Sequence, residues 1–496
     1  MLGALAELFG SPTLLGLLLL AVPIGLFFGV VPGLGGKIAI IAMLPLVFAM
    51  DQMAGCVFLI SLHAVVHTGG AVPSILFGVP GTGPSTAIVA DGHALARKGQ
   101  AVRALTASSV ASALGGVFGA LVLALLVPFS REIVTYLSYP EIFFLTLFGI
   151  LMAAGLSGDS VLRGLATGVL GLLIATMGIS HNTGDHRFTF GAMFLWDGID
   201  LITAILAIYA VPEMITLGAR GRGSATGDLR MGRPGLGQVA QGVRDVIVFR
   251  WLTFRTSVLG AVTGFIPGLG GDVAAWVCYG HAAQTSPKPE EFGRGAIDGV
   301  IGPEAANNSK EGGSLAPTLF LGLPGSSGMA ILLVALVPLG IDPGPGFLAT
   351  QPEILWIMVW ALVISNCLAA AIVVAFAPAF DRVSRLDPHV IVPFVFLLAL
   401  FSIYLSANDW RFFGIAAGLS VLGLLFKRLD WPRAPFVVAL ILGPAAEDAL
   451  VKSLAIWGPD FFLRPVSLPL MVILAFIGFR VSARLRRVAA ASEASE

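Results

Sequence analysis

The chain has few charged side chains: Asp, Glu, Lys and Arg make up 12% of its 496 residues. That is about half the fraction typical of a soluble domain, and 56% of the residues are hydrophobic. Apolar runs long enough to cross about 30 Å of hydrocarbon recur at 14–31, 104–127, 354–376 and 465–479. The sequence therefore predicts an all-α polytopic membrane protein, with about 10 to 14 spans once segments broken by Gly and Pro and re-entrant hairpins are included.

Other absences exclude whole classes of function. The three cysteines, Cys56, Cys278 and Cys367, are far apart and lack the CxxC spacing of a metal or redox site. The chain contains no GxxxxGK[ST], GxSxG or HExxH motif, so neither ATP hydrolysis nor these hydrolytic chemistries are indicated. The formal net charge is zero, which gives no reason to expect a nucleic-acid partner. Any transport by this chain must therefore draw its energy from an ion gradient.

Arginines are concentrated in the middle of the chain and at its C-terminal end. Residues 220–255 contain seven arginines against two aspartates, and four more arginines lie within 480–487. By the positive-inside rule both regions face the cytoplasm. Residues 218–243 are rich in Gly and Arg and lack a spanning apolar run, which predicts a cytoplasmic linker. The halves are then 1–217 and 244–496, the second with extra C-terminal spans.

The two halves carry the same pair of motifs in the same order. GVVPGLGG at 29–36 recurs as GFIPGLGG at 264–271, and PSILFGVPG at 73–81 recurs as PTLFLGLPG at 317–325. Chance does not explain two ordered matches, so we interpret the chain as a tandem duplication. Transporter sites often lie at the interface of inverted repeats, and we predict that orientation here.

The PGLGG segments place a proline and three glycines in apolar surroundings, where a continuous helix would not form. A break inside a membrane frees backbone groups that must be buried in protein or face a wet cavity. We therefore predict that both segments contribute to a cation site; the alternative is a kink or close helix packing through small residues. The predicted cation-binding residues are Pro32, Gly33, Gly35, Gly36, Pro267, Gly268, Gly270 and Gly271.

The second motif of each half joins two apolar arms through a turn rich in Gly, Pro and hydroxyl groups, which is typical of a re-entrant hairpin. Half-helix N-termini and hydroxyls after the turn can donate hydrogen bonds to a carboxylate. We predict that the two tips meet near the bilayer midplane and bind substrate; an ordinary surface loop is the alternative. The predicted substrate-binding residues of the tips are Pro80, Gly81, Thr82, Gly83, Ser85, Pro324, Gly325, Ser326 and Ser327.

Two further polar features lie beside these motifs. Asn307 and Asn308 in GPEAANNSKEGG offer uncharged amide groups, which suit a sodium ion or polar substrate atoms. His63 and His67 lie four residues apart and share one face if the segment is helical. A metal site would need a third ligand, and the neighbouring sequence shows none. A proton or substrate contact and a purely structural role both remain open for the two histidines.

The chain resembles the TctA family, the large membrane subunits of the tripartite tricarboxylate transporters. The resemblance depends on the PGLGG pair, on DGHALARKG at 91–99, and on GVIGPEAANN at 299–308 followed by the 317–325 hairpin. It implies cation-coupled uptake of a di- or tricarboxylate across the bacterial inner membrane, with sodium or a proton as coupling ion and no other cofactor. It also implies two partners, a small four-span membrane subunit similar to TctB and a periplasmic substrate-binding protein similar to TctC.

Two other functions compete with secondary uptake. The first is a channel or exporter of organic anions that works without a binding protein, although a channel needs a continuous polar pore. The second is a membrane-embedded enzyme, which would need a catalytic acid, base or metal cluster, and only His63 and His67 come near to one. The compact, repeated polar clusters favour alternating access at a single site.

Overall fold

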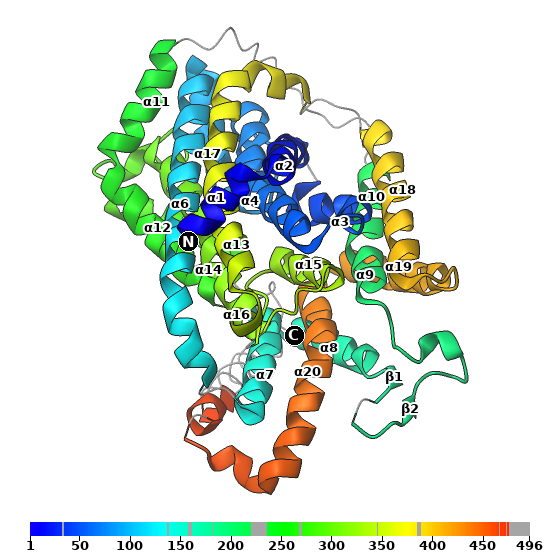
Figure 1. Ribbon diagram of the computed structural model, residues 1–496. Coiled ribbons are helices and arrows are strands. Elements are labelled where there is room, and N and C mark those ends of the chain that lie inside the picture. The colour runs from blue at the N-terminus through cyan, green and yellow to red at the C-terminus, as the bar shows by residue number, and fades with distance from the viewer. Residues whose placement is uncertain are drawn as a thin grey trace, which may run out of the picture.

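The computed structural model of the chain consists almost wholly of helices (Figure 1). It describes residues 1–31, 34–135, 138–156, 161–180, 182–219, 236–266, 270–344, 346–383, 388–465, 467–472 and 474–475. Within these ranges the strands are β1 (Gly178–Ile179) and β2 (His186–Arg187), which form one short antiparallel pair. The predicted all-α fold is confirmed.

Five helical segments in these ranges are long and apolar enough to cross a membrane. They are Pro12–Val30, Gln52–Phe77, Pro84–Pro128, Pro352–Phe376 and Ala434–Leu463. A sixth candidate is the pair Leu236–Val248 and Arg250–Phe265, which is bent by 69°. Other apolar helices have only 10–17 residues. The protein is thus a multi-pass membrane protein. The described residues contain fewer full-length crossings than the 10 to 14 predicted spans, because the prediction counted broken segments as well and because most of the apolar run 465–479 lies at or beyond the end of the described residues.

The first repeat consists of helices separated by breaks at its Gly- and Pro-rich motifs. Its elements are α1 (Leu2–Gly10), α2 (Pro12–Val30), α3 (Gly35–Val47), α4 (Gln52–Phe77), η1 (Pro84–Ile88), α5 (Val89–Leu95), η2 (Ala96–Gln100) and α6 (Ala101–Thr135). Asp51 begins α4 by accepting hydrogen bonds from the backbone N–H groups of Met53 and Ala54. Gly78 ends α4 with a φ of 67°, a left-handed conformation that glycine adopts without steric cost.

The second repeat has the same local structure. Its elements are α11 (Leu236–Val248), α12 (Arg250–Phe265), α13 (Gly270–Thr285), η5 (Pro289–Glu291), α14 (Asp298–Leu321), α15 (Ser327–Leu336) and η6 (Val337–Leu339). Gly322 ends α14 with a φ of 68°, and its N–H bonds to the carbonyl of Pro317, as Gly78 bonds to Pro73 in α4. The break between α12 and α13 corresponds to the break between α2 and α3. The duplicated motifs therefore form equivalent structures, while an inverted arrangement of the halves stays a prediction.

Most of the remaining helices lie below and to the right of the two repeats in Figure 1, while Pro352–Val383 packs against both α6 and α4. The remaining helices are α7 (Tyr139–Leu156), α8 (Val161–Ala175), η3 (Met193–Leu195), α9 (Leu201–Ile205), η4 (Leu206–Ala210), α10 (Val211–Ala219), α16 (Phe347–Thr350), α17 (Pro352–Val383), α18 (Pro388–Ala407), α19 (Phe412–Arg428), α20 (Ala434–Trp457) and η7 (Gly458–Leu463). Of the predicted linker 218–243, residues 220–235 lie outside the described residues, and α11 already begins at Leu236.

Close backbone contacts join the two repeats. Helix α14 packs along both α6 and α12. A Cβ atom on Gly312 of α14 would lie 2.0 Å from the carbonyl oxygen of Gly119 in α6, and one on Gly313 would lie 2.1 Å from that of Ala261 in α12. Contacts this close leave no room for a side chain at Gly312 or Gly313. They are typical of small-residue packing between membrane helices. The second repeat is therefore packed directly against the first.

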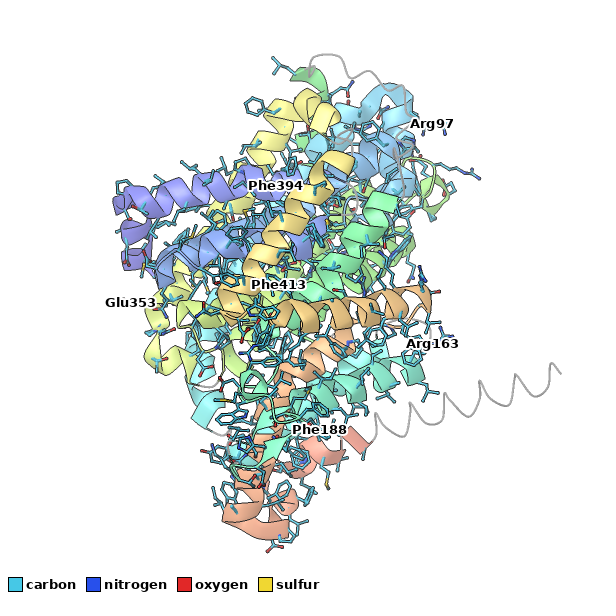
Figure 2. The ribbon with its side chains drawn as sticks, turned by 90° about the vertical axis from the view of Figure 1, so that its right-hand side faces the viewer. Arg97, Arg163, Phe188, Glu353, Phe394 and Phe413 are labelled. Atoms are coloured by element: carbon cyan, nitrogen blue, oxygen red, sulfur yellow. The ribbon has the colours of Figure 1, made fainter. Side chains whose placement is uncertain are left out.

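The outer surface of the helices is apolar, as expected of a surface that faces lipid. Phe394 of α18 is 60% exposed and lies on the outside of the molecule in Figure 2. Arg97 and Arg163 lie at the right-hand edge of the same view, and Glu353 lies at the left-hand edge. Arg97 and Arg163 thus lie on the side opposite Glu353, and the positive-inside rule predicts that their side faces the cytoplasm.

Candidate functional site

The two repeats share one cavity of about 390 Å³. The first repeat lines it with the start of α3, with one face of α4 and with the turn that leads into η1. The second repeat lines it with the first turns of α13 and α15 and with Lys310 of α14. Tyr209 of η4, Glu213 of α10 and Arg433 at the start of α20 complete the wall. Segments that are far apart in the sequence therefore meet at a single site.

Three helix N-termini point their first turns at this cavity. Gly35 and Gly36 begin α3, Gly271 lies in the first turn of α13, and Ser327 begins α15; all four line the cavity. The first turn of a helix presents unsatisfied N–H groups and a partial positive charge. Three such ends at one cavity favour an anion.

The residues of the predicted cation site lie at or before two of these helix N-termini. Gly35, Gly36 and Gly271 line the cavity where the backbone offers N–H donors, and Gly270 is the first residue of α13. These donors suit the oxygen atoms of an anion better than a cation. Four of the predicted cation-binding residues, Pro32, Gly33, Pro267 and Gly268, lie outside the described residues.

The first turn brings Pro80, Gly81, Thr82 and Gly83 to the cavity wall. The Thr82 side chain packs against Gly70 of α4, and its buried hydroxyl has no hydrogen-bond partner among the described residues. Ser85 is not part of the wall. Its hydroxyl donates to the carbonyl of Thr82 at 2.8 Å and accepts from the N–H of Thr82 at 3.1 Å. Ser85 therefore holds the shape of the turn, and the hydroxyl of Thr82 is left unpaired inside it, next to the cavity wall.

The second turn brings Ser326 and Ser327 to the same wall, while Pro324 and Gly325 are not among its residues. Ser326 caps α15 and accepts a hydrogen bond from the N–H of Met329 at 3.2 Å. The N–H of Gly325 already donates to the hydroxyl of Thr318 at 3.3 Å. Of this turn, the two serines therefore supply the groups that reach the cavity.

The turn glycines have equivalent packing roles. A Cβ on Gly81 would lie 2.5 Å from the carbonyl oxygen of Gly29, and one on Gly325 would lie 2.8 Å from that of Gly264. Gly29 and Gly264 occupy the same position of the repeated motif. Each turn thus rests on the helix that precedes the break, so a larger side chain at Gly81 or Gly325 would disturb helix packing as well as the cavity.

Basic side chains that the sequence reasoning missed also reach the cavity. Lys37 follows the first PGLGG segment, and its ammonium lies 4.9 Å from the centre of the Tyr209 ring. Lys310 comes from α14. Arg433 pairs with Glu213, the two charged groups lying 2.6 Å apart. A charged residue within an apolar helix is costly and is by default functional, a signal that would have identified Lys310.

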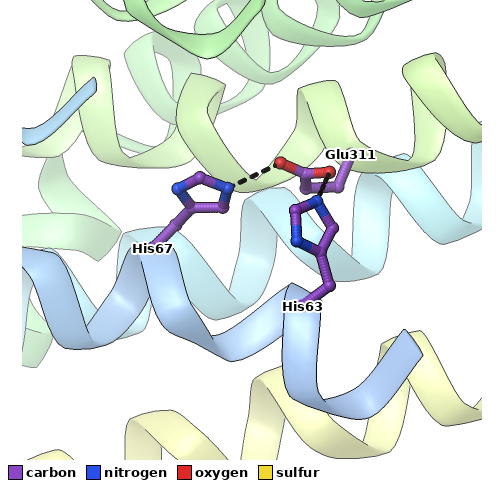
Figure 3. Close-up of side chains that lie close together, drawn as sticks. All are labelled: His63, His67 and Glu311. Carbon is purple, nitrogen blue, oxygen red and sulfur yellow. Dashed lines mark ion pairs between the residues drawn. The ribbon is translucent and has the colours of Figure 1, made fainter. Parts of the chain in front are cut away.

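His63 and His67 form a buried cluster with Glu311 (Figure 3). The Nε2 atom of His63 lies 3.2 Å from one carboxylate oxygen of Glu311, and Nε2 of His67 lies 2.9 Å from the other. The expectation that no third ligand lies near the two histidines is therefore wrong, because α14 supplies a carboxylate from a distant part of the sequence. Lys310, however, pairs with the same carboxylate, and its ammonium opposes a second cation there.

Asn307 and Asn308 are buried in the helix packing and are not part of the cavity wall. The amide nitrogen of Asn308 donates to the hydroxyl of Thr68 at 3.1 Å and to the side-chain oxygen of Asn366. Neither polar atom of the Asn307 side chain has a partner among the described residues. Asn308 thus connects α14 with α4 and α17, and the predicted substrate contact of both asparagines stays a prediction.

Asp91 connects the two repeats through hydrogen bonds. Its buried carboxylate accepts from the hydroxyl of Tyr279 at 2.8 Å and from the backbone N–H groups of Gly295 and Ala296 at 2.8 and 2.9 Å. A carboxylate with three donors is firmly held. The DGHALARKG segment therefore has a structural role in joining α5 to the loop before α14.

A cavity bounded by the broken helices of two repeats, inside a multi-pass membrane protein, is typical of a membrane transporter. The comparison with known proteins then gives the family. The chain belongs to the tripartite tricarboxylate transporter TctA family, whose profile matches residues 15–438. The resemblance seen in the sequence is thereby confirmed over most of the chain.

Two relatives from Agrobacterium vitis support this assignment. An uncharacterized 52.8 kDa protein in the TAR-I ttuC' 3' region is 30% identical over 457 residues, which are 91% of this chain and 89% of the relative. An uncharacterized protein in the TAR-II ttuC' 3' region is 29% identical over 216 residues, 43% of this chain and 89% of the relative. No solved structure matches the chain.

Proposed function

We propose that the protein is the large membrane subunit of a binding-protein-dependent tripartite transporter, and that it takes up a di- or tricarboxylate across the bacterial inner membrane by secondary, cation-coupled transport. The observation that carries the proposal is the convergence of three helix N-termini at one cavity, whose wall also holds Lys310 and Arg433, each paired with a carboxylate of the chain. Helix N-termini and basic side chains both stabilise carboxylates. A substrate with two or more carboxylates would reach donors from both repeats.

The size of the cavity agrees with a small organic acid. Its volume of about 390 Å³ falls at the lower end of the range of about 300 to 1,000 Å³ found for small-molecule sites. The hydroxyl of Thr82 and the serines of the second turn add uncharged donors beside the basic groups. A site of this kind recognises carboxylate and hydroxyl groups together.

The energy source and the partners follow from the family and from the motifs. The sequence lacks a P-loop, so an ion gradient of sodium or protons supplies the energy. The tripartite family name implies two further subunits. We propose a small TctB-like four-span membrane subunit and a TctC-like periplasmic protein that delivers the substrate. In this proposal the chain is not an enzyme and needs no cofactor apart from the coupling ion.

Uptake into proteoliposomes tests the proposal. The chain would be reconstituted with the small membrane subunit, and radiolabelled succinate, malate, tartrate and citrate would be offered with and without the binding protein. We expect uptake of at least one acid that requires both an inward ion gradient and the binding protein. Arg433→Gln should abolish it, whereas Arg411→Gln, in an exposed loop pair with Asp409, should not.

The outcomes separate the competing functions. Flux that needs neither a gradient nor the binding protein would indicate a channel, and outward flux alone would indicate an exporter. No flux of any carboxylate, in protein that remains monodisperse and inserted, would refute the proposal.

A further inference from the structure

Four ionisable groups lie together in the wall of the cavity. His63 and His67 of α4 each approach a different oxygen of the Glu311 carboxylate (Figure 3). Lys310, the residue before Glu311 in α14, pairs with the same carboxylate. All four side chains are at least nine-tenths buried, and three of them, His63, His67 and Lys310, line the cavity. Whatever binds in the cavity therefore meets this cluster directly.

The charges of the cluster balance only while both imidazoles are neutral. Lys310 and Glu311 then cancel each other. Adding a proton to either histidine would leave one uncompensated positive charge in a buried site, which is costly unless an anion lies beside it. A carboxylate in the cavity is such an anion. Proton binding and carboxylate binding consequently favour each other, and the coupling is reciprocal.

The position of the His63 ring gives the proton a place to bind. Since Nε2 faces the carboxylate of Glu311, it carries the hydrogen in the neutral form, and Nδ1 is left as the basic atom. No ring nitrogen of either histidine has a partner with hydrogen-bond geometry among the described residues; Nε2 of each ring has its ion-pair contact with Glu311, and no such contact involves Nδ1. A Cβ atom added to Gly36 would lie 3.2 Å from Nδ1 of His63, and a Cβ atom added to Gly328 would lie 2.9 Å from Cε1 of the same ring. The ring is thus held between the first turns of α3 and α15.

A metal ion is the rival occupant of this cluster. The ligand atoms of His63, His67 and Glu311 lie within 4.8 Å of one another, which a metal ion could bridge. The ammonium of Lys310 already pairs with Glu311, so a dication would be placed next to a fixed positive charge. A proton needs neither a vacant coordination site nor the removal of Lys310.

We propose that the proton is the coupling ion and that the His63–Glu311–His67 cluster carries it together with the substrate. The other charged or titratable groups around it are Lys310 of α14, Lys37 of α3, Tyr209 of η4, Glu213 of α10 and Arg433 before α20; α2 and α15 contain no charged residue. A carboxylate enters the cavity, one imidazole takes up a proton at Nδ1, and both leave on the cytoplasmic side. This inference rests on the proposed carboxylate transport.

Carboxylate binding to the purified chain, measured against pH by calorimetry, tests the inference. Tartrate and malate are suitable probes because both are fully ionised from about pH 6 upward, so that only protein groups titrate. Proton uptake on binding is measured in parallel with a dye in weak buffer, with and without sodium. The variants are His63→Gln and His67→Gln, which keep an N–H donor for Glu311 but cannot take up a proton. His186→Gln, an exposed histidine of β2, is the matched control.

In the wild-type protein and in His186→Gln we expect uptake of about one proton for each acid bound, and an affinity that falls up to about tenfold per pH unit above the titration range of imidazole. The double glutamine variant should still bind but lose both effects. If both glutamine variants fail to fold, proton uptake by the wild-type protein decides the question alone.

An affinity that does not depend on pH but requires sodium would refute the proton as coupling ion. It would leave the proposed carboxylate transport in place. If the double variant took up as many protons as the wild-type protein, the assignment of the proton to the His63–Glu311–His67 cluster would be refuted. Inhibition of binding by a chelator, together with one bound metal ion per chain, would assign the cluster to a metal. Absence of binding by any carboxylate would refute the proposed function and this inference with it.

Discussion

The substitution Thr82→Val should weaken carboxylate binding without changing the stability of the folded protein. Valine has the shape of threonine without the hydroxyl, and the Thr82 hydroxyl has no partner among the described residues. The folded protein should therefore keep its stability. A hydrogen bond to a charged group contributes about 1.5–3 kcal/mol, and 1.4 kcal/mol corresponds to a factor of about 10. We expect the dissociation constant of the carboxylate to rise about 10- to 150-fold.

Ser85→Ala is the matched comparison, because the Ser85 hydroxyl makes its hydrogen bonds with the backbone of Thr82 in the turn and with Ser74 of α4. Its loss leaves the N–H of Thr82 unpaired at a cost of about 1–3 kcal/mol. We expect a lower melting temperature in detergent for Ser85→Ala and an unchanged one for Thr82→Val, with binding measured by calorimetry. Wild-type affinity in Thr82→Val, or a loss of stability equal to that of Ser85→Ala, would refute the assignment of the Thr82 hydroxyl.

Three further predictions concern the fold. Asp91→Asn should lower the stability by about 1.5–3 kcal/mol, since it removes the charge that strengthens three hydrogen bonds between the repeats; a melting curve in detergent checks this, and an unchanged melting temperature would contradict it. Gly312→Val should prevent the close contact of α14 with α6 and reduce the yield of monodisperse protein on gel filtration, whereas Gly418→Val, which has free space around it, should not. In a background without native cysteines, a cysteine at Lys98 should react only from the cytoplasmic side and one at Glu353 only from the periplasmic side; the reverse pattern would invert the topology.

The repeated motifs allowed much of the fold and part of the site to be predicted. Gly and Pro dictate local backbone conformation, so the breaks before α3 and α13 and the turns after α4 and α14 can be read from the sequence. Repetition then indicates that the two turns belong to equivalent structures. Thr82 and Ser326, which were singled out on this basis, do line the same cavity.

Long-range packing could not be predicted in the same way. Glu311 approaches His63 and His67 because α14 crosses α4, and no local pattern reports such a crossing. The sequence also does not show which neighbouring helix or cavity a side chain on a helix faces. Asn308 and Lys310 are two residues apart, yet Asn308 bonds to Thr68 and Asn366 inside the packing, while Lys310 lines the cavity.

The close packing of α14 against α6 limits how such a transporter can move. Alternating access requires one part of the protein to rotate against another around the substrate. Backbone contacts at Gly312 and the hydrogen bonds of Asp91 hold the two repeats together, so the repeats cannot serve as the two moving bodies. The cavity wall formed by Tyr209, Glu213 and Arg433 comes from outside both repeat cores and depends on no such glycine contact with α14. Motion around the substrate is therefore to be sought where the wall formed by η4, α10 and the start of α20 meets the joined repeats.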